Sequence, residues 1–225
     1  MYPVRNYLLT LTTALLFSLA NVPSATGAVI PVLNSSFEQP ATAIFTGNDI
    51  TDWSGFGIGS FGVQNIATLP TQLPGGVPDG MQMGFINVGS ISQDVPATLT
   101  AGTTYTLTVF LGRRTDNPGA AGILELDTVG GILLASSRDL TPPLGGFTPF
   151  SVSFTPALGD PSLGQQLRIV LRNPNPNVQI DFDEVSLGAP AAVPEPPSIL
   201  LFGMSAGALL GVVWYRRGRR TKRVE

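Results

Sequence analysis

The middle of the chain alternates apolar and polar residues with a period of two, which is typical of β-strands that bury one face. The clearest runs are Tyr105–Leu111, Phe150–Phe154 and Leu167–Leu171. Shorter apolar runs bounded by turn residues predict further strands, at Val29–Leu33, Phe61–Ile66, Gln82–Asn87, Ile91–Val95, Ile123–Asp127 and Ile132–Ala135. No amphipathic helix interrupts them. We therefore expect one all-β sandwich domain over residues 29–188.

Two local features refine this pattern. Thr128-Val129-Gly130-Gly131 separates two predicted strands and is typical of a β-hairpin turn. In the last strand, Ile180 and Phe182 alternate in one phase and Val185 and Leu187 in the other, so we expect a β-bulge near Asp183-Glu184. The Pro- and Gly-rich stretch 69–80 predicts a long surface loop.

Residues 1–28 have the pattern of a secretory signal peptide. Arg5 provides a basic start, Leu8–Ala20 an apolar core, and Ser24–Ala28 small residues for cleavage. An uncleaved membrane anchor is the alternative, against which the small residues argue.

The C-terminal end consists of a Pro-rich linker at 189–197, an uncharged apolar run at 198–215 and a basic tail at 216–225. The run lies at the short end of the range of lengths that a transmembrane helix needs. The basic residues that follow would stop transfer and stay in the cytoplasm, and they include Arg216, Arg217, Arg219 and Arg220. We expect one membrane-spanning helix; a helix buried in a soluble core is the alternative.

A proline-containing motif, one span and an arginine cluster, in this order at the C-terminus, resemble the PEP-CTERM sorting signal. Pro194, Glu195 and Pro196 stand where that signal has its tripeptide. The resemblance implies an exported protein of exopolysaccharide-producing bacteria, recognised in the inner membrane by an exosortase and then placed at the cell surface or outside the cell.

Charge and missing residue types exclude several functions. Between residues 29 and 190 only five arginines stand against thirteen acids, a net charge of −8, which disfavours nucleic-acid binding. The chain has no Cys and no His. Disulfides, His/Cys zinc sites and Ser-His-Asp or Cys-His nucleophiles are therefore excluded, whereas oxygen-ligated hard cations are not.

Several segments resemble, in order, the galactose-binding-like jelly rolls of carbohydrate-binding modules. They are Asn34–Glu38, Trp53, Ile91–Val95, Ala101–Leu107 and the closing Ile180–Val185. Ser35 departs from the usual glycine of the first motif. The resemblance implies a jelly-roll β-sandwich that associates with polysaccharide.

Such jelly rolls often hold a structural Ca²⁺ between the first and last strands. Glu38 matches the first-strand acid and Asp183 the last-strand acid, and Asp181 is a further candidate ligand. Ca²⁺ takes 6–8 oxygens, so backbone carbonyls and water would complete the shell. The alternative is that these acids cap strand ends in solvent.

Trp53, Arg113 and Arg114 are candidates for ligand binding. Sugar-binding sites stack aromatic rings on pyranose faces, and the polar loop at Arg113-Arg114 follows a strong strand. For Trp53 the favoured alternative is a core position.

Together these patterns predict an exported surface or matrix protein that associates with exopolysaccharide and is not an enzyme. A structural or adhesive protein without sugar binding is the alternative. Glycoside hydrolysis needs two carboxylates flanking a cleft, and nothing in the spacing of the acids selects such a pair.

Overall fold

The structure, a computed structural model, describes residues 28–56 and 60–189, which form eleven strands and one short 3₁₀ helix. The elements are β1 (Ala28–Ile30), β2 (Ser54–Phe56), β3 (Phe61–Asn65), η1 (Ile66–Thr68), β4 (Gln82–Ile86), β5 (Gly89–Thr98), β6 (Tyr105–Arg113), β7 (Gly122–Thr128), β8 (Leu133–Leu140), β9 (Gly146–Phe154), β10 (Gln166–Asn173) and β11 (Ile180–Ala189).

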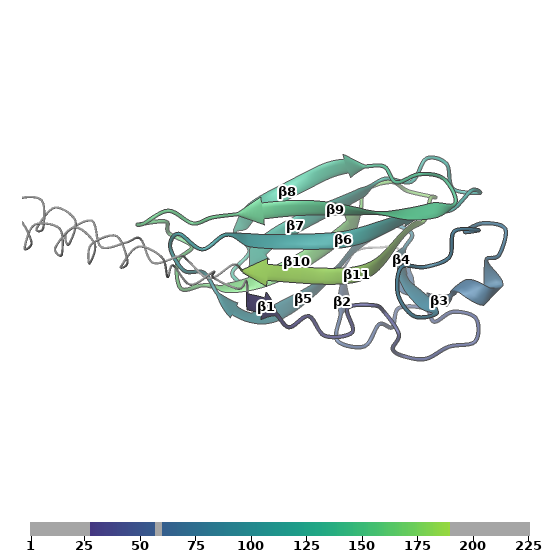
Figure 1. Cartoon of the computed structure of the whole chain (residues 1–225), viewed down its shortest axis with the longest axis horizontal. Coiled ribbons are helices and arrows are strands. Elements are labelled where there is room, and N and C mark those ends of the chain that lie inside the picture. Colours follow the sequence, from purple (N-terminus) through teal and green to yellow (C-terminus); the bar gives the residue numbers. More distant parts are fainter. Residues whose placement is uncertain (1–27, 57–59, 190–225) are drawn as a thin grey trace, which may run out of the picture. The chain divides into compact units, whose positions relative to one another are not determined.

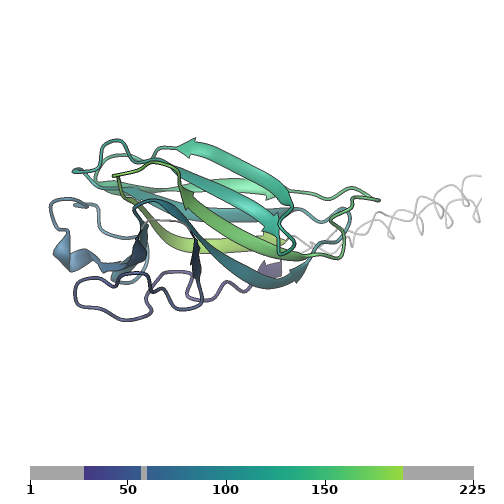
Figure 2. The same cartoon turned by 180° about the vertical axis from the view of Figure 1, so that it is seen from behind.

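The strands form two antiparallel sheets packed face to face, as Figures 1 and 2 show from opposite sides. Sheet A has the order β3-β4-β11-β6-β9, and β1 also pairs with β11. Sheet B has the order β2-β5-β10-β7-β8. The expected all-β sandwich is confirmed.

The core lies between the sheets and is built from the inward positions of each strand. On β6 these are Leu107, Val109 and Leu111, and on β10 Leu167, Ile169 and Leu171, all of them fully buried. The polar residues that alternate with them face outward. Burial of these side chains, each contributing about 1.5–3 kcal/mol, is the main force that holds the sandwich together.

Both local predictions about turns are confirmed. The chain reverses between β7 and β8, where Gly131 has φ +88° and the Ile132 carbonyl accepts from the Thr128 amide at 2.9 Å. The β11–β6 register shifts between Asp183 and Ser186, and Glu184 has φ +46°. This bulge restores Val185 and Leu187 to the core after the change of phase.

The predicted long loop between β3 and β4 is more deeply packed than a surface loop. Leu69 and Leu73 are buried and form a second apolar cluster with Met83 of β4. Asn65 caps the preceding helix η1 by accepting from the Ala67 amide at 2.9 Å.

In the part of the chain that the structure describes, no helix is long and apolar enough to cross a membrane. The predicted span at 198–215, the Pro194–Pro196 motif and the basic tail lie outside the described residues. So do residues 1–27, where the signal peptide is predicted.

The core account predicts that Leu171→Ala lowers the free energy of unfolding by about 2–5 kcal/mol, because it leaves a cavity at the centre of sheet B. Urea unfolding measures the loss. Leu158→Ala is the matched control, since Leu158 is 93% exposed and should change stability by less than about 0.5 kcal/mol. Equal losses in the two variants would contradict this account.

Candidate functional site

Strand β11 places two carboxylates on the outer face of sheet A. Ile180 and Phe182 point into the core, so Asp181 and Asp183 point the other way. Both acids are nevertheless fully buried. Buried carboxylates require either a partner or a proton.

Asp181 has only one hydrogen-bond partner among the described residues. Its Oδ1 accepts a hydrogen bond from Nε2 of Gln179 at 2.6 Å, while its buried Oδ2 accepts none. Burial raises the pKa of Asp181 to about 7, against the opposing effect of the Gln179 hydrogen bond. The carboxyl group therefore keeps its proton to a higher pH than an ordinary aspartate does.

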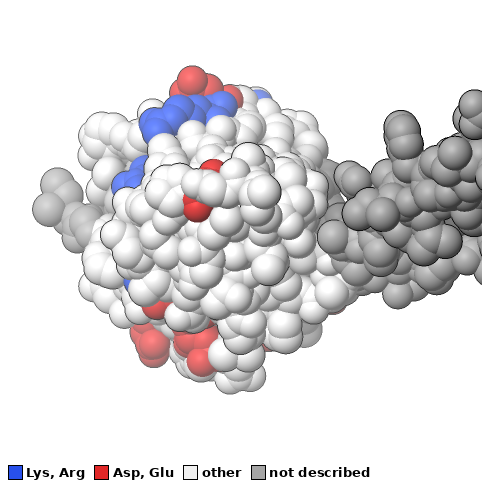
Figure 3. Space-filling view, turned by 90° about the vertical axis from the view of Figure 1, so that its left-hand side faces the viewer, with Lys and Arg blue, Asp and Glu red and all other residues white. Residues whose placement is uncertain are grey.

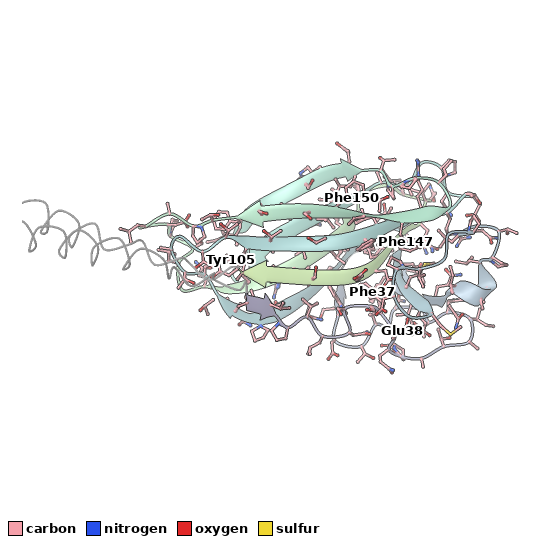
Figure 4. The ribbon with its side chains drawn as sticks, viewed as in Figure 1. Phe37, Glu38, Tyr105, Phe147 and Phe150 are labelled. Carbon is pink, nitrogen blue, oxygen red and sulfur yellow. The ribbon has the colours of Figure 1, made fainter. Side chains whose placement is uncertain are left out.

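Aromatic side chains flank Asp181 in the sheet. Phe85 lies directly opposite it on β4, and Gly112 lies directly opposite on β6. The ring of Phe147 occupies the space above Gly112, where a Cβ would come within 2.4 Å of it. Figure 4 shows Phe147 near this end of the sheet. Asp181 thus lies between Phe85 and a position covered by Phe147.

The loop between β3 and β4 covers the same outer face. Its Leu69 and Leu73 pack on Met83, and Phe147 contacts that cluster. The amide of Thr115 donates to the Gln72 carbonyl at 3.0 Å and so fastens the loop to the β6–β7 connection. This cover keeps water away from the end of the outer face.

Arg114, predicted as part of a ligand-binding rim, lies close to Asp181. It donates to Oε1 of Gln179 at 3.4 Å and pairs with Asp116 at 2.6 Å. The hydrogen bond from Arg114 lowers the pKa of Asp116. Gln179 is also 3.3 Å from Oε1 of Gln64, so its amide is held from two sides. Arg113, the neighbouring candidate, donates instead to the Pro118 carbonyl.

Glu38 and Asp183 form a second acidic group near the start of β4. Glu38 accepts from the amides of Met81 and Gln82 at 2.8 and 2.7 Å, and Asp183 accepts from those of Asp79 and Glu184 at 3.0 and 2.8 Å. Burial raises the pKa of Asp183 to about 7, and the charges of Asp79 and Glu38 add to this rise. The structure thus brings Glu38 and Asp183 together, as predicted, whereas Asp181 hydrogen-bonds elsewhere.

Trp53, the remaining predicted ligand-binding residue, belongs to the core. It is 6% exposed, its ring packs on Phe37 with centroids 5.3 Å apart, and its Nε1 donates to the Asn34 carbonyl. Trp53 therefore occupies a core position, which was the favoured alternative to a role in ligand binding.

The outer face of sheet B carries a separate charge network. Buried Glu125 pairs with Arg172 at 2.8 Å and with Arg138 at 3.5 Å. Asp127 is the next residue on the same face of β7, and its buried Oδ1 has no hydrogen bond in the part of the chain that the structure describes. Burial and the charge of Glu125 raise the pKa of Asp127. Figure 3 shows one face of the molecule, on which charged side chains form small separate groups at the upper and lower edges and one acidic group within the uncharged surface.

The protein is thus a sandwich of two antiparallel sheets that carries a buried, protonatable acid on the outer face of one sheet. Comparison with known proteins identifies the family. The HpiC1 cyclase family (HpiC1-like) matches residues 28–188, which is most of the chain and all of the sandwich except its last residue. The chain belongs to this family of cyclases.

Solved structures agree with this fold. The Stig cyclase Fisc from Fischerella sp. TAU, in complex with (3Z)-3-(1-methyl-2-pyrrolidinylidene)-3H-indole, is 23% identical with a TM-score of 0.66, over 73% of this chain and 98% of that one. A cyclase from the same source in complex with 4-(1H-indol-3-yl)butan-2-one is 24% identical with a TM-score of 0.65, over 72% and 97%. An apo cyclase from Fischerella sp. is 26% identical with a TM-score of 0.65, over 75% and 99%. No curated protein matches.

These findings correct the functional prediction from the sequence. The chain belongs to a family of enzymes, so the prediction of a non-enzymatic surface protein was wrong. The sequence also predicted a PEP-CTERM protein with a polysaccharide-binding domain, an exosortase partner and an inner-membrane association, and this prediction was wrong as well. Two of the similar structures contain small indole compounds, and no comparison supports a sorting signal. Export through residues 1–28 stays a prediction.

Sequence reasoning missed Gln179 and Phe147. One signal was available: Gln179 and Asp181 are two residues apart in a strand, so their side chains share a face. The aromatic neighbours come from other strands, and only the strand order brings them to Asp181.

The charge network of sheet B generates a pH prediction. Because the pKa of Asp127 is raised in the folded state, the folded chain binds more protons than the unfolded one between the two pKa values, and stability falls as pH rises through that range. The stability of Asp127→Asn relative to the wild type should therefore be greater at about pH 7 than at about pH 3.5. Urea unfolding at both pH values measures this change. Asp139→Asn, at an exposed acid, is the control; the same gain there would contradict the account.

Proposed function

We propose that this protein is a cyclase that closes a ring in an apolar, indole-bearing substrate at the outer face of sheet A, with Asp181 as the proton donor. The observation that carries the proposal is the Asp181 carboxyl group: it is buried, held by Gln179 through one oxygen, and without a hydrogen-bond partner at the other within residues 28–56 and 60–189. A carboxyl group in that arrangement donates a hydrogen bond through its free oxygen when it is protonated.

The surroundings of this carboxyl group suit an apolar substrate. Phe85 lies opposite Asp181 in the sheet and Phe147 covers the position on its other side. Aromatic faces stabilise a nearby cation by about 0.5–2 kcal/mol, more when water is excluded. The rings of Phe85 and Phe147 would thus favour the cation that protonation of the substrate creates.

The chemistry balances without a redox partner. Asp181 transfers its proton to an electron-rich atom of the substrate, and a π bond of the same molecule attacks the resulting cation, which closes the ring. Loss of a proton back to the Asp181 carboxylate ends the step and regenerates the acid. Substrate and product are then isomers.

The ligands of the similar cyclases support the choice of substrate class. Both compounds named with the Fischerella proteins contain an indole ring. At 23% and 24% identity these structures establish the fold, and the extension of their ligand class to this chain is part of the proposal.

The test is Asp181→Asn, which keeps the shape of the side chain and removes the acid. Ring closure of an indole-bearing precursor, followed as the appearance of an isomer of equal mass and different retention, should slow by about 10²–10⁴-fold. Binding of 4-(1H-indol-3-yl)butan-2-one, measured by calorimetry, should change only a few-fold.

Asp127→Asn is the matched control, because Asp127 also carries a buried oxygen without a hydrogen bond but lies on sheet B. It should retain wild-type turnover. Full activity in Asp181→Asn, or an equal loss in Asp127→Asn, would contradict the assignment.

We also propose that a structural Ca²⁺ binds at Glu38 and Asp183. The two carboxylates, with Asp79 beside them, form an acidic group with no ion pair among the described residues. The carbonyl of Ser35 accepts from the Val185 amide at 2.9 Å, which ties the Glu38 segment to β11 at this place. A divalent cation would relieve the repulsion between these charges.

The residues fit Ca²⁺ only with help from other oxygens. Within residues 28–56 and 60–189, no three acidic side chains converge closely enough to hold an ion by themselves. Ca²⁺ accepts 6–8 oxygen ligands in flexible geometry, so backbone carbonyls and water would supply the rest. An ion there would join the first part of the domain to its last strand, as in the galactose-binding-like jelly rolls, and we propose that finer class for the sandwich.

Excess Ca²⁺ should raise the melting temperature by roughly 5–10 °C over a metal-free sample. A ligand at 100 times its Kd adds about 2.7 kcal/mol, and each kcal/mol shifts the melting temperature by about 2–4 °C in a domain of this size. Mg²⁺ should do less, since it holds its waters more firmly. Glu38→Gln should lose most of the shift, and Asp49→Asn, at an exposed acid, should keep it. Identical melting curves with Ca²⁺ and with EDTA would refute the proposal.

A further inference from the structure

A groove on the other sheet has no part in the proposed cyclase site. It has a volume of about 280 Å³ and runs along the edge strand β2 and its neighbour β5, on the outer face of sheet B. Its main lining residues are Asp52, Ser54, Phe56, Ser92, Asp94 and Arg168. We call it the β2 groove.

The alternation of side chains along β2 determines which of them line the β2 groove. Trp53 points into the core, so Ser54 and Phe56 share the outer face at every second residue, and Asp52, in the turn just before β2, also lines the groove. Ser54 lies opposite Ser92 on β5. The groove thus has an acidic end at Asp52, two hydroxyl groups in the middle and an aromatic ring at the far end, over a length of about 13 Å at most.

The acidic end has spare negative charge. Arg168 is paired with Asp94, to which it donates through both Nε and Nη2. Asp94 is thereby neutralised, whereas the Asp52 carboxylate has no ion pair or side-chain hydrogen bond among the described residues. Among the described residues, a ligand that enters this end meets an unpaired carboxylate and an arginine that already has a carboxylate partner.

The rest of the groove is preformed. Buried Gln93 donates to the carbonyls of Leu33 and Asp52, at 2.9 and 3.0 Å, and accepts from the Leu33 amide at 2.9 Å. These bonds tie the segments on either side of the groove to β5. Phe56, at 59% exposed, and Leu33, at 56%, leave apolar surface open to a ligand.

We propose that the β2 groove binds an organic cation: a protonated amine carried on an apolar, aromatic body. The ammonium group pairs with Asp52 and donates to the Ser54 and Ser92 hydroxyls, and the ring packs on Phe56. The net charge of −8 between residues 29 and 190 also favours a cationic ligand over an anion. This site is independent of Asp181, since it lies on the opposite sheet.

Phenethylamine is a suitable probe, because it has an aromatic ring and an ammonium group but no indole. Titrated into the isotope-labelled full chain and followed by NMR, it should shift the amide signals of Ser54, Phe56 and Ser92. N-acetylphenethylamine, which carries no charge, should bind at least about tenfold more weakly, since hydrogen bonds to charged groups contribute about 1.5–3 kcal/mol.

Asp52→Asn tests the charge directly. Asp52 has φ +68°, a conformation that Asn tolerates well, so the variant should fold. Its affinity for phenethylamine should fall about tenfold or more, and that of Phe56→Ala should also fall. Asp139→Asn removes one negative charge elsewhere and should stay within about twofold of the wild type.

Equal binding of the charged and the acetylated probe would overturn the proposal. So would unchanged affinity in Asp52→Asn, or signal shifts confined to the outer face of sheet A. Loss of affinity in Asp139→Asn equal to that in Asp52→Asn would show attraction by net charge alone and would overturn it as well.

Discussion

The alternation of side chains along β11 is the constraint on which the rest of the structure depends. This strand lies inside sheet A and pairs with β1, β4 and β6. Its apolar residues fill the core, and every inward residue fixes an outward neighbour. A shift of one residue would bury the two aspartates between the sheets and expose Phe182. The hydrophobic core therefore determines where the carboxylates stand.

Asp181 and Asp183, which both precede the bulge at Glu184, have different surroundings. Before it, Asp181 faces Phe85 in a region that the β3–β4 loop covers, and the acid is held by an amide. Next to it, Asp183 faces the backbone amides and acids of the loops around Glu38. The same strand thus carries both the acid that we propose for proton transfer and the acid that we propose for cation binding. The two roles differ because the neighbouring residues of the two acids differ.

The fold could be predicted from the sequence because it depends on period-two alternation and on turn residues. The hairpin after Thr128 and the bulge after Asp183 were both visible in the order of apolar residues. The meeting of Glu38 and Asp183 followed from a family resemblance. The site at Asp181 could not be predicted, because its character comes from burial and from one missing hydrogen bond, which depend on the strand order. The absence of His and Cys excluded zinc sites and nucleophile triads, and no pair of acids suggested a glycosidase, yet a single buried carboxyl group is enough for acid catalysis.

The central claim is that the outer face of sheet A at Asp181 holds the substrate. A crystal structure of this protein with 4-(1H-indol-3-yl)butan-2-one tests it most directly. We predict the indole ring beside Phe85 and Phe147, with a polar atom of the ligand or a bridging water within hydrogen-bond distance of Oδ2 of Asp181. A ligand found only in the β2 groove, or elsewhere on sheet B, would contradict the account.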